Sequence, residues 1–251
     1  MTSKTQNVSW NLFFLLLILL FTGCKKNDAP HTFNVKTTDF KIYEAGLNGY
    51  TNVWYAYTYN SAGEISTEQI FMPSDSNYYQ FSYSANNYTQ SLTQNGVPKP
   101  DVIYTLNANG NCINSTDGYI YTYDSVGYLL KKIYIQYSDT ITDTYTYADG
   151  NMITDVNSTL ENGNSVPNVT TTTYTYISGK LETRYSSPQH FGKGNKNLIA
   201  TSTQVSGNDV SQIVFTYNFD SSDAVTKQTE AVSDPPGSAA IYTYVGTYTY
   251  Y

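Results

Sequence analysis

Residues 121–129 read Tyr-Thr-Tyr-Asp-Ser-Val-Gly-Tyr-Leu, a strand followed by the turn that reverses it. Successive side chains of a β-strand point to opposite faces, so Tyr121 and Tyr123 share one face and the hydroxyl of Thr122 lies on the other. The Asp-Ser-Val-Gly segment can reverse the chain, because Gly adopts positive φ without strain and Asp bonds its own backbone. The stretch therefore predicts an antiparallel hairpin with one aromatic face and one hydroxyl face.

The same unit recurs along the chain as aromatic, polar, aromatic, then three or four turn residues and a returning segment. The other copies begin at Tyr57, Phe81, Tyr104, Tyr145, Tyr174, Tyr217 and, as an eighth copy, Tyr242. Several copies are 24 residues apart, for example Tyr59 and Tyr83. The interval from Tyr176 to Phe219 is 43 residues, which predicts an inserted hairpin or a long loop between them.

The repeat indicates an all-β fold. About two strands per copy give on the order of 14–16 strands joined as hairpins. An open sheet of more than about ten strands curls or splits, and it leaves unpaired edges. We therefore expect an antiparallel hairpin meander that is strongly curled or closed into a barrel-like form. The 27 tyrosines favour strands, and their rings supply the packing that aliphatic side chains supply elsewhere.

An apolar run from Leu12 to Phe21 precedes Thr22-Gly23-Cys24. Ten apolar residues are too few for a membrane-spanning helix, which needs about 20, but they match the h-region of a signal peptide. Phe21-Thr-Gly-Cys24 resembles the lipobox of bacterial lipoproteins, in which the cysteine thiol carries a diacylglycerol. We expect residues 1–23 to be a lipoprotein signal peptide, residues 24–38 the lipidated Cys24 with a polar tether, and residues 39–251 a single all-β repeat domain.

The lipobox also implies a location. Lys25 follows the cysteine, and by resemblance to sorting in double-membraned bacteria this residue favours the outer membrane. We expect the protein to be anchored there by acyl chains such as palmitate on Cys24, without crossing the membrane, on either the periplasmic or the surface-exposed face. A cleaved signal peptide with an incidental cysteine is the alternative.

Two resemblances follow from these motifs. Residues 121–129 resemble a YD repeat of the Rhs type, whose units build long curved β-sheets. The whole chain is similar to a family of bacterial lipoproteins of unknown function with a porin-like fold, in which a lipobox precedes Tyr-x-Tyr hairpins and a segment like residues 191–198 precedes the last ones. The resemblance covers nearly all of residues 40–251. It implies a porin-like fold and carries over no catalytic residue.

Composition and motifs argue against several classes of function. The formal net charge of −7 repels phosphate backbones, so we expect no nucleic-acid partner. Gly-x-Ser-x-Gly, His-Glu-x-x-His and the Walker pattern are absent, so we expect no enzyme, cofactor or metal site. Asp139, Asp143 and Asp149 could surround calcium, but they lack the EF-hand spacing, and solvated turns explain them better. The oligomeric state stays open.

Cys112 and His190 are the residues whose side chains could act in catalysis. Cys112 follows a turn, and we expect it to behave as a small half-buried apolar residue, since nothing near it in sequence lowers its thiol pKa. His190 lies in Ser186-Ser-Pro-Gln-His-Phe191, where we expect a surface-loop histidine. Loss of hydrolytic turnover on substitution of His190 would support a hydrolase.

What remains is a non-catalytic binding or structural module at the outer membrane or cell surface. Aromatic rings on a rigid sheet can stack against a glycan or peptide ligand. Trp54, Tyr55, Tyr57 and His190 are the candidate ligand-facing residues. The alternative is a carbohydrate-binding lipoprotein of a nutrient-uptake system. An outer-membrane pore is less expected, because lipid-facing strands alternate apolar residues, whereas these strands alternate Tyr with Thr, Ser or Asn.

Overall fold

The computed structural model describes residues 33–44, 51–73, 75–136, 139–161, 166–185 and 189–251. The leader, the proposed lipobox and Cys24 lie outside these residues. The described strands are β1 (Phe33–Glu44), β2 (Thr51–Tyr59), β3 (Ile65–Met72), β4 (Asp75–Tyr83), β5 (Asn87–Gln94), β6 (Val97–Pro98), β7 (Val102–Leu106), β8 (Cys112–Ser115), β9 (Tyr119–Tyr123), β10 (Leu129–Gln136), β11 (Asp139–Ala148), β12 (Asn151–Leu160), β13 (Asn168–Leu181), β14 (Arg184–Tyr185), β15 (Asn197–Ser206), β16 (Asp209–Phe219), β17 (Val225–Ser233) and β18 (Tyr242–Tyr250). A short 3₁₀ helix, η1, spans Gln189–Phe191.

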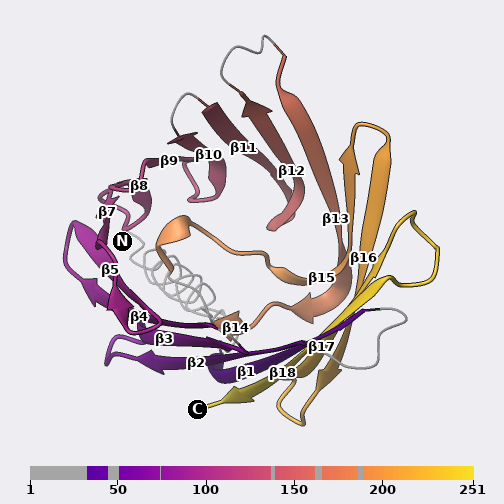
Figure 1. The fold of residues 1–251 in the computed structure, drawn as a ribbon, viewed down its shortest axis with the longest axis horizontal. Helices are drawn as coiled ribbons and strands as arrows, with labels where there is room; N and C mark the ends of the chain where they lie inside the picture. Colours follow the sequence, from indigo (N-terminus) through magenta and orange to yellow (C-terminus); the bar gives the residue numbers. More distant parts are fainter. Residues whose placement is uncertain (1–32, 45–50, 74, 137–138, 162–165, 186–188) are drawn as a thin grey trace, which may run out of the picture. The chain divides into compact units, whose positions relative to one another are not determined.

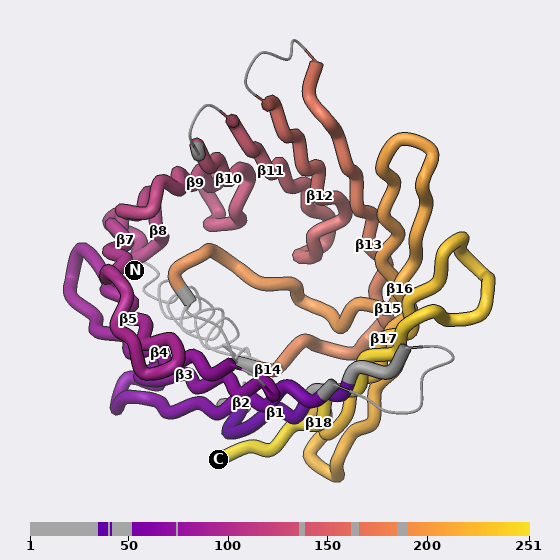
Figure 2. Tube along the Cα trace, in the orientation of Figure 1, coloured from indigo at the N-terminus to yellow at the C-terminus, as the bar shows by residue number. Residues whose placement is uncertain are grey.

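The described strands form a closed antiparallel barrel (Figure 1). All of them except β6 and β14 make up its wall, which gives 16 wall strands. Closure comes from β1, which pairs antiparallel with both β2 and β18, so indigo β1 and yellow β18 lie side by side in Figure 2. The prediction of an all-β meander closed into a barrel is confirmed.

The repeat unit corresponds to one hairpin of the barrel. The strand that carries each Tyr-x-Tyr motif is paired with a returning strand, as in β2–β3, β4–β5, β9–β10 and β16–β17. The eighth motif lies at Tyr248-Thr249-Tyr250 rather than at Tyr242, because Tyr250 is opposite Val35 in β1. Strand β1 is thus the returning strand of the last copy, and the first strand of the chain completes the repeat begun by the last.

The start of the barrel differs from the expected domain boundary. Strand β1 begins at Phe33, so residues 33–38 of the expected tether belong to the barrel instead. Val35 and Thr38 are buried and face inward from this strand. The polar composition of residues 25–36 concealed the strand, because half of a barrel strand faces solvent.

The turns are held by their first residue. In the turn after β9, Oδ1 of Asp124 accepts hydrogen bonds from the backbone N–H groups of Val126, Gly127 and Tyr128 at 2.9, 2.7 and 2.9 Å. Asn60, Asn107 and Asp220 do the same for their own turns. These turns all follow a Tyr-x-Tyr strand, so in an antiparallel barrel they lie at one end, which we call the turn end.

The motif aromatics point into the barrel, and their hydroxyls bond to backbone. Tyr59 donates to the carbonyl oxygen of Val35 at 2.7 Å, and Tyr83 donates to that of Ile65 at 2.6 Å. Tyr176 and Tyr250 repeat this contact with Met152 and Val225. In the copy that ends in Phe219, Tyr217 donates to Ile199 instead. Each bond links a hairpin to a neighbouring strand, which explains why the repeat uses Tyr rather than Phe.

The outer face carries the hydroxyl residues. Threonines on neighbouring strands pair through their Oγ1 atoms: Thr37 with Thr249 at 2.5 Å, Thr58 with Thr67 at 2.7 Å, Thr146 with Thr154 at 2.5 Å and Thr175 with Thr201 at 2.7 Å. The predicted division into an aromatic and a hydroxyl face therefore holds at these four strand pairs.

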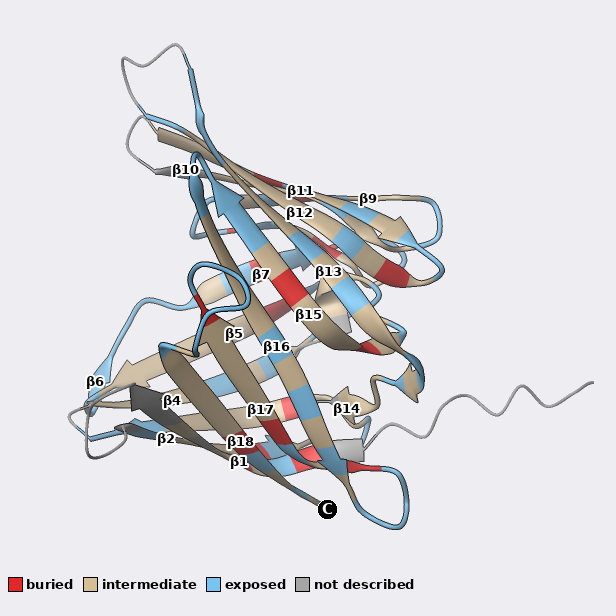
Figure 3. Ribbon diagram, turned by 90° about the vertical axis from the view of Figure 1, so that its right-hand side faces the viewer, coloured by how far each residue is buried: buried red, intermediate tan, exposed pale blue. Residues whose placement is uncertain are grey.

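The apolar core is spread along the inner face rather than gathered at a centre, and most residues in Figure 3 are only partly buried. One cluster contains Tyr88, Tyr104, Leu106, Cys112 and Tyr121. A second contains Val35, Tyr57 and Ile65. Among the described residues, no helix has both the length and the apolar character needed to cross a membrane.

Candidate functional site

The insertion predicted between Tyr176 and Phe219 is a segment that leaves the wall and enters the barrel. We call residues 182–185 and 189–197 the inner strap. In Figure 1 its β14 and η1 lie inside the ring of strands, and β14 pairs parallel with β1. Its backbone bonds to two turns: Lys193 N to Gly127 O and Lys196 N to Gly150 O, both 2.9 Å. The strap therefore lines the inside of the turn end.

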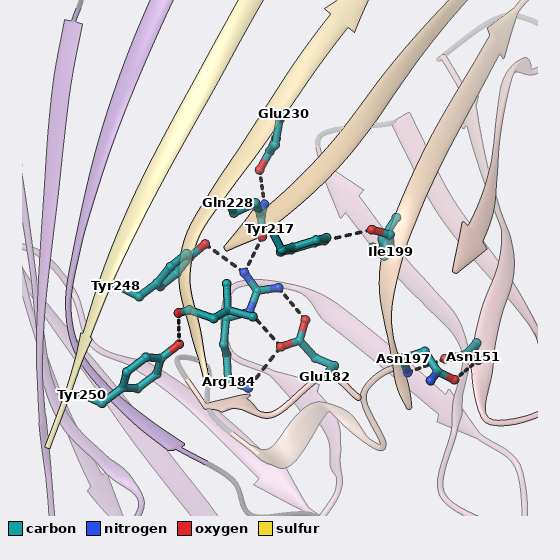
Figure 4. A network of polar contacts seen from close by, with 11 residues as sticks. Asn151, Glu182, Arg184, Asn197, Ile199, Tyr217, Gln228, Glu230, Tyr248 and Tyr250 are labelled. Carbon is teal, nitrogen blue, oxygen red and sulfur yellow. Dashed lines mark hydrogen bonds and ion pairs between the residues drawn. The ribbon is translucent and has the colours of Figure 1, made fainter. Parts of the chain in front are cut away.

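Arg184 fixes one end of the strap to the wall (Figure 4). Its guanidinium donates two hydrogen bonds to Glu182, with Nε to Oε1 at 2.8 Å and Nη2 to Oε2 at 2.5 Å. It also donates to the hydroxyl of Tyr248 at 2.9 Å and to Oε1 of Gln228. Burial by itself lowers the pKa of Arg184, but the hydrogen bond and charge of Glu182 outweigh it and raise the pKa. Arg184 therefore stays charged.

The network extends to a second carboxyl group. Nε2 of Gln228 donates to Oε1 of Glu230 at 2.5 Å. Burial raises the pKa of Glu230, although the Gln228 hydrogen bond and the charge of Arg184 both act to lower it. The strap thus brings a cation to a stretch of inner wall that already holds buried polar groups from β17 and β18.

His190 and Phe191 hold the other end of the strap. Nδ1 of His190 lies 2.8 Å from the carbonyl oxygen of Gly110 and must carry the proton, because a carbonyl only accepts. The imidazole stacks on Tyr88, with centroids 5.0 Å apart, and the Phe191 ring meets Tyr104 edge-on at 5.7 Å. The expectation of a surface-loop histidine is wrong, because the strap turns inward and inserts His190 among tyrosine rings.

The wall formed by β2, β3 and β4 combines tyrosine rings with a carboxyl group. Tyr55 and Tyr57 stack with centroids 6.5 Å apart, and the Tyr57 side chain hydrogen-bonds Glu68. Burial raises the pKa of Glu68 despite that bond, and burial also raises the pKa of Tyr79 on the next strand. Tyr55, Glu68 and Tyr79 are only partly buried, so each of the three residues keeps some exposed surface.

A second polar group lies on β10–β12. Lys132 Nζ is 2.7 Å from Asp143 Oδ2, and Asn157 donates to Oδ1 of the same carboxylate. Burial raises the pKa of Asp155, the charge of Asp143 adds to it, and Lys132 opposes it. Asp143 is therefore a buried strand residue, which corrects its assignment to a solvated turn. Within the described ranges, no three His, Cys, Asp or Glu side chains gather in a way that could hold a metal.

The structure separates the expected ligand-facing residues. Tyr55 and Tyr57 face inward. Trp54 precedes Tyr55 in the strand and therefore points to the outer face, where the centroid of its ring lies 5.1 Å from that of Phe71. His190 belongs to the strap.

Cys112 is fully buried, more than expected, and burial raises the pKa of its thiol to about 12. The thiol is therefore protonated at neutral pH.

Glu68, Arg184 and Asp155 are polar residues of the inner wall and strap that were not predicted from the sequence. The position of Glu68 could have been predicted, because the turn after β2 sets the register of the hairpin and that register places Glu68 opposite Tyr57. Asp155 lies opposite Tyr145 for the same reason. Arg184 had no such signal for its contacts with the wall, since Gln228 and Tyr248 lie 44 and 64 residues away.

Comparisons with known proteins bear on the fold. No family model matches the sequence, and no curated protein matches it. The structure is similar to the crystal structure of a porin-like protein from Bacteroides uniformis, with a TM-score of 0.61 at 17% identity, covering 86% of this chain and 98% of that one. The barrel described above is thus shared with a protein of porin-like fold.

Proposed function

We propose that the chain is a lipid-anchored, non-catalytic binding protein of the bacterial outer membrane whose inner wall takes a saccharide. The observation that supports this most is the group of partly buried Tyr55, Glu68 and Tyr79, where aromatic rings stand beside a hydrogen-bonding carboxyl. Aromatic faces with a few convergent polar groups are typical of small-molecule sites. A peptide with aromatic or basic side chains is the other ligand suited to such a wall.

The anchor is supported by sequence. The h-region, the small residues before Cys24 and the following Lys25 form the expected lipoprotein leader. Mass spectrometry of the purified protein tests it: the N-terminal peptide begins at Cys24 with its acyl chains, and Cys24→Ser abolishes both the lipid and membrane fractionation. An unmodified cysteine in wild type refutes the anchor.

Binding is tested by screening the full chain, in mild detergent, against a panel of oligosaccharides. Tyr55→Ala weakens the affinity about fivefold to tenfold, since a stacked ring contributes about 1 kcal/mol. Trp54→Ala is the matched control, because it removes an adjacent ring from the outer face of the same strand. Loss of affinity with Trp54→Ala alone overturns the inner-wall assignment, and no affinity across the panel overturns the saccharide.

A pore is the competing function, and the outer face of β11 argues against it. Strands that face hydrocarbon present an apolar residue at alternate positions. Here the alternate positions of β11 are Thr140, Thr142, Thr144 and Thr146. Planar-bilayer recordings without conductance steps agree with the binding protein, and reproducible steps refute it.

A further inference from the structure

The inner strap crosses the turn end very closely at one point. Gly192 has φ +84°, and a Cβ there would lie 2.7 Å from Gly127 O and 2.9 Å from Cε1 of Tyr123. The neighbouring Lys193 N donates to the same Gly127 oxygen at 2.9 Å. This contact joins the strap to the turn after β9 through backbone, and only glycine permits it.

A hollow of about 420 Å³ opens beside this crossing. It lies between the turn after β7, the turn after β9 and the strap, and its lining is Asn109, Asn111, Ser125, Val126, Gly127, Gly192 and Lys193. Small-molecule sites have volumes of about 300–1,000 Å³, so the hollow is of ligand size.

The polar side chains of the hollow are not used to hold the turns. Oδ1 of Asn107 accepts hydrogen bonds from backbone N–H groups of the turn after β7. Oδ1 of Asp124 accepts three such bonds in the turn after β9. The side chains of Asn109, Asn111 and Ser125 have no hydrogen-bond partner among the described residues. Two carboxamides and a hydroxyl therefore face the hollow on a backbone that is already fixed.

The charge of the hollow comes from Lys193. Its ammonium lies 5.5 Å from the centroid of the Tyr128 ring. Asp124 lies close enough to interact with it: hydrogen bonds from the backbone N–H groups of Tyr128, Gly127 and Val126 lower the pKa of Asp124, and the charge of Lys193 lowers it further. Glu182 offsets the charge of Arg184, so Lys193 and Lys196 leave the strap with a net positive charge in an acidic chain.

We propose that this hollow is a second binding site, for a saccharide that bears a carboxylate, such as a uronic acid. Lys193 pairs with the carboxylate, and the carboxamides of Asn109 and Asn111 bond the ring hydroxyls. None of the lining residues belongs to the Tyr55–Glu68–Tyr79 wall, so the two sites are independent.

The test titrates the full chain, in mild detergent and low salt, with glucuronic acid, with short oligogalacturonates and with their methyl esters. Binding of the acids exceeds that of the esters, and Lys193→Gln lowers acid affinity about twofold to fivefold, the range of an exposed ion pair. Lys227→Gln is the control, because Lys227 is exposed in β17 and carries the same charge. Asn111→Ala weakens acids and esters alike.

The proposal is overturned if no uronate binds at millimolar concentration, or if acid and ester bind with equal affinity. It is also overturned if neither Lys193→Gln nor Asn111→Ala changes the affinity, or if Lys227→Gln lowers acid affinity as much as Lys193→Gln does. Loss of neutral-saccharide binding with Tyr55→Ala bears only on the inner wall. Failure of one site is thus distinguishable from failure of the other.

Discussion

The hydroxyl of Tyr83 donates a hydrogen bond to the carbonyl oxygen of Ile65, 2.6 Å away, and so joins the turn end of β4 to the first residue of β3. The same bond recurs at Tyr59, Tyr176 and Tyr250, each of which is the second aromatic of its motif. The aromatic repeat is therefore also a hydrogen-bonding repeat.

Tyr83→Phe removes this hydroxyl and leaves a buried carbonyl oxygen without its second partner. We expect the free energy of unfolding to fall by about 1 kcal/mol, which corresponds to about 2–4 °C in Tm for a chain of this size. Tyr78→Phe on the outer face of the same strand is the control and leaves Tm nearly unchanged. Equal melting temperatures for Tyr83→Phe and wild type would show that the bond does not stabilise the barrel.

Arg184→Met should release the strap. The substitution leaves Glu182 charged beside the inner wall, and because the pair is only partly buried we expect a loss of about 1–3 kcal/mol, less than for a fully buried pair. The double variant Arg184→Met with Glu182→Leu recovers much of this loss, because no unpaired charge remains. Hydrogen exchange of strap amides checks both. Unchanged protection in Arg184→Met contradicts the role of the pair as an anchor.

Gly192→Ala tests the crossing of strap and turn. The added methyl group meets Gly127 O at 2.7 Å on a backbone with positive φ, so we expect a loss of about 1–3 kcal/mol. Gly194→Ala, two residues away, has open space and serves as the control, with a change within about 0.5 kcal/mol. Chemical denaturation measures both. Similar free energies of unfolding for the two variants would mean that the strap shifts at Gly192 without a measurable cost.

The carboxyls of Glu68 and Glu230 make stability depend on pH. Burial raises both pKa values in the folded state, so the folded protein binds more protons than the unfolded chain. Their contribution is complete below the unfolded pKa of about 4.3 and is lost as pH rises through the raised values. Glu68→Gln should therefore stabilise the protein at pH 8 relative to wild type. It should also reduce the fall in the free energy of unfolding as the pH rises above about 4.3.

Unfolding by denaturant at pH 4 and pH 8 measures the effect of Glu68→Gln. Glu64→Gln, in the turn just before β3, removes the same charge without removing a buried carboxyl. A larger gain in stability at pH 8 from Glu64→Gln than from Glu68→Gln contradicts the assignment.

Asp124 and Asp220 have the opposite effect on the pH dependence. Hydrogen bonds from their turns lower their pKa values, so they stabilise the protein above the unfolded pKa and lose this effect in acid.

The sequence by itself determined the hairpins, their turns and the two faces of the sheet. Strand alternation and the N–H-accepting side chains of Asn107 and Asp124 act within a few residues, so they can be derived without the rest of the chain. The same alternation places Trp54 opposite to Tyr55 and Tyr57, so their separation was also within reach of the sequence.

Tertiary structure decided the closure of β1 on β18, the inward path of the strap and the burial of His190. Closure depends on twist and stagger accumulated over the whole sheet, which no local pattern specifies. Arg184 likewise meets Gln228 and Tyr248 only because the closed wall brings β17 and β18 to the strap. Contacts between segments far apart in the chain form once the barrel exists, and the candidate binding surfaces are made of such contacts.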